Sequence, residues 1–206
     1  MKTEFSGNIY RISLDFDLGF VYAELLDYTD VREFDGILIQ VYNYIETGNE
    51  KQIDIEKIKS NEILFGPVPI NKYPNNKGKF AWKYIGKSNS YSKEFPWFKS
   101  FRGLINKDDN WSNLSPWFKA NIHGIDSNSI EYNYEDVRRL ETLILNHPEM
   151  VKIKVTMLLL INKGEIVRDF YDLTNIGNRN MYIQLINTYY DNNKVEELLK
   201  YINIRL

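Results

Sequence analysis

The chain has 206 residues, of which 43 % are hydrophobic and 26 % charged, and a formal net charge of −2. This size and composition are those of one folded domain or two tightly packed subdomains, and they exclude extensive disorder. Cysteine is absent, which excludes disulfides, thiolate metal sites and a cysteine nucleophile. The only two histidines, His123 and His147, are too few for a multi-histidine metal site.

The first 45 residues have the pattern of β-structure. Residues 8–14, 20–28 and 37–45 are rich in β-branched and aromatic side chains and alternate in polarity, so we expect three strands. Gly19 and Gly36 mark the turns between them. Strands in this order predict an antiparallel meander, left open or curled into a small barrel.

The next part of the chain is less regular. Residues 54–59 fit either a helical turn or an edge strand, and residues 63–65 form an extended segment that prolines interrupt. Residues 71–79 are typical of an exposed loop, and residues 80–85 of another strand.

A short motif, Pro-Trp-Phe-Lys, occurs at residues 96–99 and again at 116–119. Because Ser115 before Pro116 is typical of a helix start, each copy is expected to begin a helical turn. The motif would place Trp97 and Trp117 as buried anchors that fix loops on the sheet.

The last 75 residues have mainly helical patterns. Apolar residues at helical spacing predict a helix over 134–146. Residues 148–163 fit a helix that ends near Gly164, but their alternation also fits a strand; we favour the helix. Three more helices are expected over residues 166–173, 178–190 and 194–202.

Together these elements predict an α+β protein, in which an N-terminal antiparallel β-meander or small barrel precedes a mainly helical C-terminal part. We expect a β-rich part over residues 1–125, with a basic aromatic segment at 66–125, and a helical part over 126–206. The two parts are expected to pack as one compact unit.

Charge is distributed in blocks along the chain. Residues 1–65 carry a net charge of −7, residues 66–125 carry +7, and the remainder carries −2. Such asymmetry can steer a charged partner, or the acidic block can dock on the basic one inside the fold. If the charge asymmetry steers a partner, we expect the contact residues to be acidic side chains of the first block: Glu24, Asp27, Asp30, Glu33 and Asp35.

Motifs for catalysis are missing. The chain contains no phosphate-binding loop, no dinucleotide fingerprint and no nucleophile elbow. The carboxylate pairs Asp15–Asp17 and Asp108–Asp109 lie in expected turns, where Asp bonds its own backbone. His123 precedes a glycine and His147 precedes a proline, which favours structural roles. We therefore predict no catalytic residue, no metal site and no cofactor.

The basic aromatic segment holds all four tryptophans and ten basic residues, a combination that can hold single-stranded nucleic acid. The whole chain is acidic, with a pI near 5.8, and lacks any nucleic-acid-binding motif, so nucleic acid is disfavoured as a partner. Aromatic side chains beside charges equally suit a protein–protein contact.

Three segments resemble the immunity protein 26 family. They are residues 6–14 (SGNIYRISL), 19–25 (GFVYAEL) and 36–42 (GILIQVY), which give a Gly-led strand, a second strand that begins with Gly and an aromatic residue, and a third that ends a meander. The resemblance covers residues 6–45. It implies a protein encoded beside a bacterial polymorphic toxin that protects the producing cell by binding that toxin, and it assigns no catalytic residue.

Two classes of function follow. The first is a non-enzymatic bacterial immunity protein whose partner is a cognate protein toxin. The second is an enzyme or small-ligand-binding protein with an aromatic-lined cleft between the β part and the helices. The N-terminus lacks the apolar stretch of a signal peptide, and the longest apolar run, residues 157–161, is too short to span a bilayer. We expect a cytoplasmic protein without membrane association.

Overall fold

The computed structural model describes most of the sheet and all of the long helices. The described residues are 5–32, 36–48, 53–75, 77, 82–89, 101–104, 117–121, 124–125 and 132–202.

The N-terminal part is a five-stranded antiparallel sheet with strand order β4-β3-β2-β1-β5. Its strands are β1 (Asn8–Ser13), β2 (Phe20–Tyr28), β3 (Gly36–Glu46), β4 (Ile63–Ile70) and β5 (Lys83–Lys87). The first three match the expected strands and form the predicted meander. The sheet is open, because β4 and β5 lie at its opposite edges, so the barrel alternative is wrong. The fold class, α+β, is confirmed.

Both faces of the sheet are covered. Alternation along β2 sends Val21, Ala23 and Leu25 into the main core and Tyr22 to the opposite face. The main core lies between the sheet and the C-terminal helices. The opposite face packs against the short helix α1 (Ile55–Lys59), whose Ile58 is buried there. This two-sided cover explains why β2 is buried along almost its whole length.

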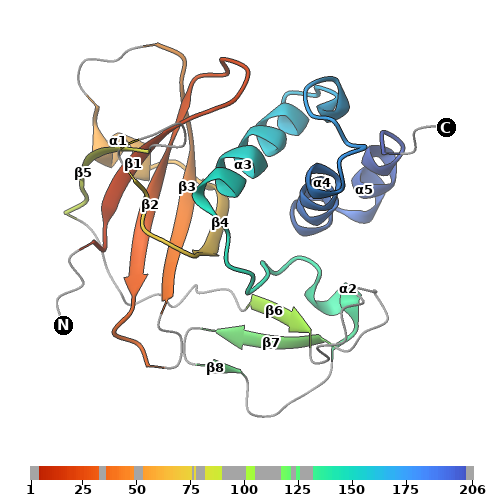
Figure 1. The fold of residues 1–206 in the computed structure, drawn as a ribbon, viewed down its shortest axis with the longest axis horizontal. Helices are drawn as coiled ribbons and strands as arrows, with labels where there is room; N and C mark the ends of the chain where they lie inside the picture. The colour runs from red at the N-terminus through yellow and green to blue at the C-terminus, as the bar shows by residue number, and fades with distance from the viewer. Residues whose placement is uncertain are drawn as a thin grey trace.

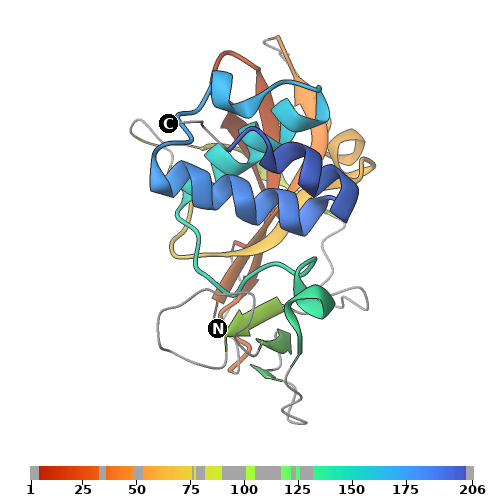
Figure 2. The same ribbon diagram turned by 90° about the vertical axis from the view of Figure 1, so that its right-hand side faces the viewer.

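The C-terminal part contains α2 (Tyr134–Val137), α3 (Pro148–Asn162), a 3₁₀ turn (Val167–Asp169), α4 (Ile176–Tyr189) and α5 (Asn192–Leu199). Figure 1 shows α3 alongside the sheet, with α4 and α5 on its outer side, and Figure 2 shows α4 and α5 from the front. The helical prediction for residues 148–163 is confirmed, and α1 resolves the ambiguity at residues 54–59 in favour of a helix.

Three predicted helical segments are wrong or too long. The helix that begins at Tyr134 ends at Val137, because the following segment forms bridges to strands: Thr142 pairs with Arg102 and Asn146 with Ile70. Within residues 166–173 only the 3₁₀ turn forms. The second Pro-Trp-Phe-Lys copy does not begin a helical turn at its tryptophan, because residues 117–121 form a strand.

A second, smaller sheet has the order β6-β7-β8, with β6 (Phe101–Leu104), β7 (Trp117–Asn121) and β8 (Gly124–Ile125). It lies at one end of the molecule, below the first sheet in Figure 1. Phe101 packs with Leu26, Tyr28 and Leu38 of the first sheet and so joins the two sheets. Trp117 is buried, as expected; Trp97 and the boundary predicted at residues 125–126 lie at or outside the edges of the described residues.

Candidate functional site

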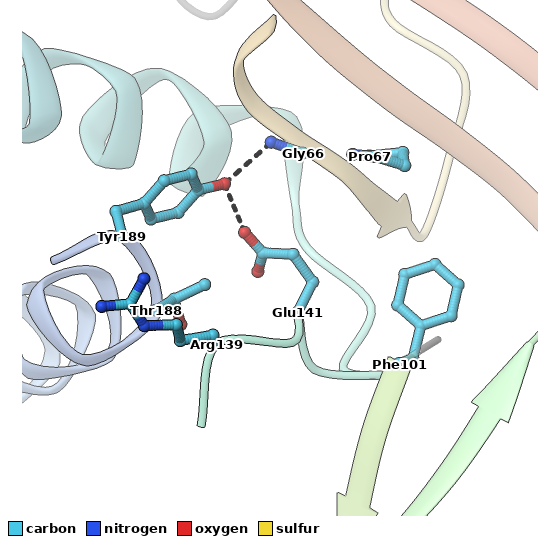
Figure 3. Close-up of a pocket in the computed structure, with 7 residues that line it drawn as sticks. All are labelled: Gly66, Pro67, Phe101, Arg139, Glu141, Thr188 and Tyr189. Atoms are coloured by element: carbon cyan, nitrogen blue, oxygen red, sulfur yellow. Dashed lines mark hydrogen bonds between the residues drawn. The ribbon is translucent and has the colours of Figure 1, made fainter. Parts of the chain in front are cut away.

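A cavity of about 230 Å³ lies where the two sheets meet the C-terminal helices. Strand β4, strand β6, the segment between α2 and α3, and the last turn of α4 each contribute to its wall. Figure 3 shows the lining residues, which are Gly66, Pro67, Phe101, Arg139, Glu141, Thr188 and Tyr189.

The hydroxyl group of Tyr189 is the polar centre of this cavity. It donates a hydrogen bond to the Glu141 carboxylate and accepts one of 2.8 Å from the backbone N–H of Gly66 (Figure 3). The Tyr189 ring stacks on Phe65, with 5.9 Å between ring centroids. One side chain therefore links α4, strand β4 and the segment after α2.

Glycine is required at position 66 because the backbone there has φ +90°. A Cβ atom at this position would lie 2.6 Å from the carbonyl oxygen of Ile39, which is backbone and cannot move aside. The strand therefore keeps the geometry that presents the Gly66 N–H to Tyr189.

Two buried basic side chains, those of Arg102 and Lys154, lie behind the cavity wall. Arg102, next to the lining residue Phe101, is 3 % exposed and donates hydrogen bonds to the backbone oxygen of Arg138 (2.5 Å) and to Thr188 Oγ1 (3.4 Å). Lys154 of α3 is also 3 % exposed and donates to Asn146 Oδ1 at 2.7 Å. The acceptors that the described residues offer these two cations are neutral groups.

Burial sets the protonation of the polar groups here. It lowers the pKa of Arg102 and of Lys154, and the charge of Glu141 acts in the opposite direction on both. Burial and the nearby Glu141 carboxylate raise the pKa of Tyr189 well above 10, so its hydroxyl stays protonated as a hydrogen-bond donor at neutral pH. The cavity therefore combines positive charge with hydrogen-bonding groups, which suits it to bind a polar or charged chemical group.

The acidic residues predicted to contact a partner lie elsewhere. Glu24 is 2 % exposed and sits on the sheet face beneath α1, where its carboxylate accepts hydrogen bonds from Lys59 Nζ (2.9 Å), Gln40 Nε2 (3.0 Å) and the hydroxyl of Tyr42. Tyr42 has a raised pKa, first through burial and then through Glu24. In this structure Glu24 belongs to an internal network and does not form part of an exposed acidic face.

Asp27 is likewise 2 % exposed and accepts hydrogen bonds from Thr29 and from the Tyr73 hydroxyl (3.1 Å). Asp30 is exposed. Glu33 and Asp35 lie outside the described residues. None of the three described residues lines the cavity, and their role in partner binding stays a prediction.

Asp15 and His147, which were also considered for chemistry, have structural partners. Asp15 forms an ion pair with Lys152 (2.5 Å) and accepts a hydrogen bond from the Tyr171 hydroxyl (2.7 Å). His147 caps α3, since its Nδ1 accepts from the N–H of Glu149 at 3.2 Å. His123, Asp108 and Asp109 lie outside the described residues. Searched over the described ranges, the chain has no cluster of three potential metal ligands and no helix long and apolar enough to cross a membrane.

Sequence reasoning missed Glu141 and Tyr189. They are 48 residues apart, in two different predicted helices. The signal that could have found them is a carboxylate within one predicted helix and a tyrosine near the end of another, a combination that is too common to be specific. Arg102 lies in the basic aromatic segment, where nothing in the sequence distinguishes it from the other basic residues.

The fold and the cavity define an α+β protein in which an open antiparallel sheet, a small second sheet and a helical layer meet at a polar junction. A protein-family model, Immunity protein 26, matches residues 6–110, which is just over half of the chain. The chain therefore belongs to the immunity protein 26 family. The match begins before β1 and extends past β6, so the helices α3 to α5 lie beyond it. Comparisons with curated proteins and with solved structures gave no match.

Proposed function

We propose that this protein acts in the bacterial cytoplasm as a non-enzymatic immunity protein that binds and neutralises a cognate toxin. The observation that carries the proposal is the family match over residues 6–110, which covers the whole first sheet. The polar groups that line the cavity support the proposal, because they can form hydrogen bonds and ion pairs with a bound protein. The uneven distribution of acidic and basic residues along the chain would speed the encounter with a charged partner.

The acidic residues named from the sequence remain part of this proposal in a narrower form. Glu24 and Asp27 are buried and bonded within the fold, so the proposed contact with the toxin is limited to Asp30, which is exposed, and to Glu33 and Asp35, which follow it in the sequence. Reversing the charge at Asp30, Glu33 and Asp35 together should slow association with the toxin and weaken its salt dependence.

The experiment is co-expression with the toxin encoded by the neighbouring gene. We expect cells that carry both genes to grow, cells that carry the toxin gene alone to stop growing, and the two proteins to co-purify as a complex. A destabilised variant such as Glu24→Lys serves as the control that should fail to protect. Growth arrest in the presence of well-folded wild-type protein would contradict the proposal.

A second candidate is a small-ligand-binding protein, because the cavity lies between the β part and the helices and has Phe101 and Tyr189 in its wall. Its volume of about 230 Å³ is below the 300–1,000 Å³ typical of pockets that enclose a small molecule. The cavity is better matched to a single side chain of a partner protein.

A further inference from the structure

The junction cavity is surrounded by more positive than negative charge. Arg139 is an exposed lining residue, and the buried side chains of Arg102 and Lys154 lie behind the wall. Against these three cations, the lining provides one carboxylate, that of Glu141, which already accepts the hydrogen bond from Tyr189.

None of the three cations has an ion-pair partner among the described residues. Arg102 also has a buried Nε–H for which the described part of the chain offers no acceptor. Arg102 and Lys154 are held away from water without an ion pair to any described residue, which is unfavourable, so the protein retains these two cations at a cost in stability. An anionic group that entered the cavity would offset that cost.

The shape of the cavity restricts what can enter. Phe101 and Pro67 supply apolar wall on one side, while Arg139 and Thr188 supply polar wall on the other (Figure 3). A short aliphatic stem that ends in a carboxylate would contact both kinds of wall. The guanidinium of Arg139 can hold such a carboxylate through two parallel hydrogen bonds.

We propose that the junction cavity receives an aspartate or glutamate side chain of the bound toxin, an inference that rests on the proposed function. The carboxylate pairs with Arg139 and lies in the field of Arg102 and Lys154. Glu141 does not prevent this, because it supplies one negative charge against three positive ones and one of its oxygens is held by the Tyr189 hydroxyl. The cavity joins residues inside the family match, such as Phe101, to residues beyond it, such as Arg139.

The first test uses the isolated full-length protein and three probes of one size: propionate, propionamide and ethylammonium. Backbone amide signals of Gly66 and Glu141 are followed by NMR during each titration. We expect saturable shifts with propionate, at least fivefold weaker binding of propionate to Arg139→Gln, and unchanged binding to the control Arg168→Gln, which removes an exposed charge elsewhere. Equal response to propionamide, stronger response to ethylammonium, no saturable response, or an unaffected Arg139→Gln would overturn the proposal.

The second test measures the affinity of the toxin from the neighbouring gene. Arg139→Glu should weaken binding about 10- to 100-fold, and Arg168→Glu should not, provided both variants melt as the wild type does. A toxin Asp→Arg or Glu→Arg substitution that restores binding to Arg139→Glu would identify the inserted side chain. If the toxin binds wild type and Arg139→Glu equally, this inference fails while the proposed function stands. If wild type binds no toxin, the proposed function fails, and the propionate titration alone decides the charge preference of the cavity.

Discussion

At the scale of single residues, Tyr189 shows how one hydroxyl group can hold three elements together. It satisfies the N–H of Gly66 on β4 and the carboxylate of Glu141, both in a part-buried setting. Removing the hydroxyl takes the acceptor from the Gly66 N–H and one hydrogen bond from the Glu141 carboxylate, which is more unfavourable than the loss of an exposed hydrogen bond.

We therefore expect Tyr189→Phe to lower the free energy of unfolding by about 1–3 kcal/mol, as measured by urea denaturation. Tyr190→Phe is the matched control, because its hydroxyl bonds exposed Asn162 at 2.5 Å. That control should change stability by less than about 1 kcal/mol. Equal effects of the two variants would show that the link to Gly66 and Glu141 contributes nothing.

Glu24 offers a second residue-scale prediction. Glu24→Gln removes the anion that pairs with Lys59, whose side chain is 15 % exposed. Breaking a fully buried pair costs 3–5 kcal/mol, and the partial exposure of Lys59 reduces this, so we expect a loss of about 2–4 kcal/mol. Asp30→Asn, at an exposed carboxylate in the turn after β2, should change stability by no more than about 0.5 kcal/mol. Thermal melting of both variants provides the comparison, and a stable Glu24→Gln would argue that the network is dispensable.

At the scale of elements, the second sheet depends on Trp117. This side chain is 3 % exposed, and its ring lies 5.5 Å from that of Tyr134 on α2 and the same distance from the guanidinium carbon of Arg102. Trp117→Ala should destabilise the protein by about 3–5 kcal/mol, the usual range for a buried large aromatic. Trp117→Phe keeps most of the packing and should lose less. An unchanged melting temperature for Trp117→Ala would contradict the anchor role.

Local patterns predicted some elements well and others poorly, for identifiable reasons. Alternation and turn glycines located β1, β2 and β3 because each strand pairs with its neighbour in sequence. Helix α3 was ambiguous because it is buried on most sides, with Val151, Val155 and Leu159 all in the core, so its apolar pattern lacks a clear helical period.

Long-range pairing explains the failures. The segment after α2 has a helical pattern, but Thr142 bridges to Arg102 and Asn146 to Ile70, and tertiary contacts of this kind override local propensity. The candidate site depends on the same long-range contacts. Glu141 and Tyr189 become neighbours only after the helices pack, so no local sequence motif could predict their contact.

At the scale of the whole molecule, buried tyrosines predict how stability changes at high pH. Burial raises the pKa of Tyr182 to about 12. Burial also raises the pKa of Tyr42 and Tyr171, each beside a carboxylate. The folded protein therefore keeps protons that the unfolded chain releases near pH 10.

This stabilisation is fully present below about pH 10 and is lost as pH rises through the folded-state values. We expect the urea midpoint to fall steadily above pH 10. Difference absorbance of tyrosinate should rise in two phases, first from exposed tyrosines and then with cooperative unfolding. Ionisation of all the tyrosines in one phase near pH 10, with the fold retained, would contradict the assignment.

The core between the sheet and the helices also affects how the protein folds during its synthesis. Side chains of β1 to β4 on one face, such as Val21 and Ile39, are covered by α3, α4 and α5, which the ribosome makes after the sheet. At about 5–20 residues per second, the stretch over residues 132–202 takes roughly 4–14 s to synthesise. During that interval the nascent sheet presents an apolar face to its surroundings, so the yield of active protein in a growing cell should depend on how well chaperones shield that face until the helices arrive.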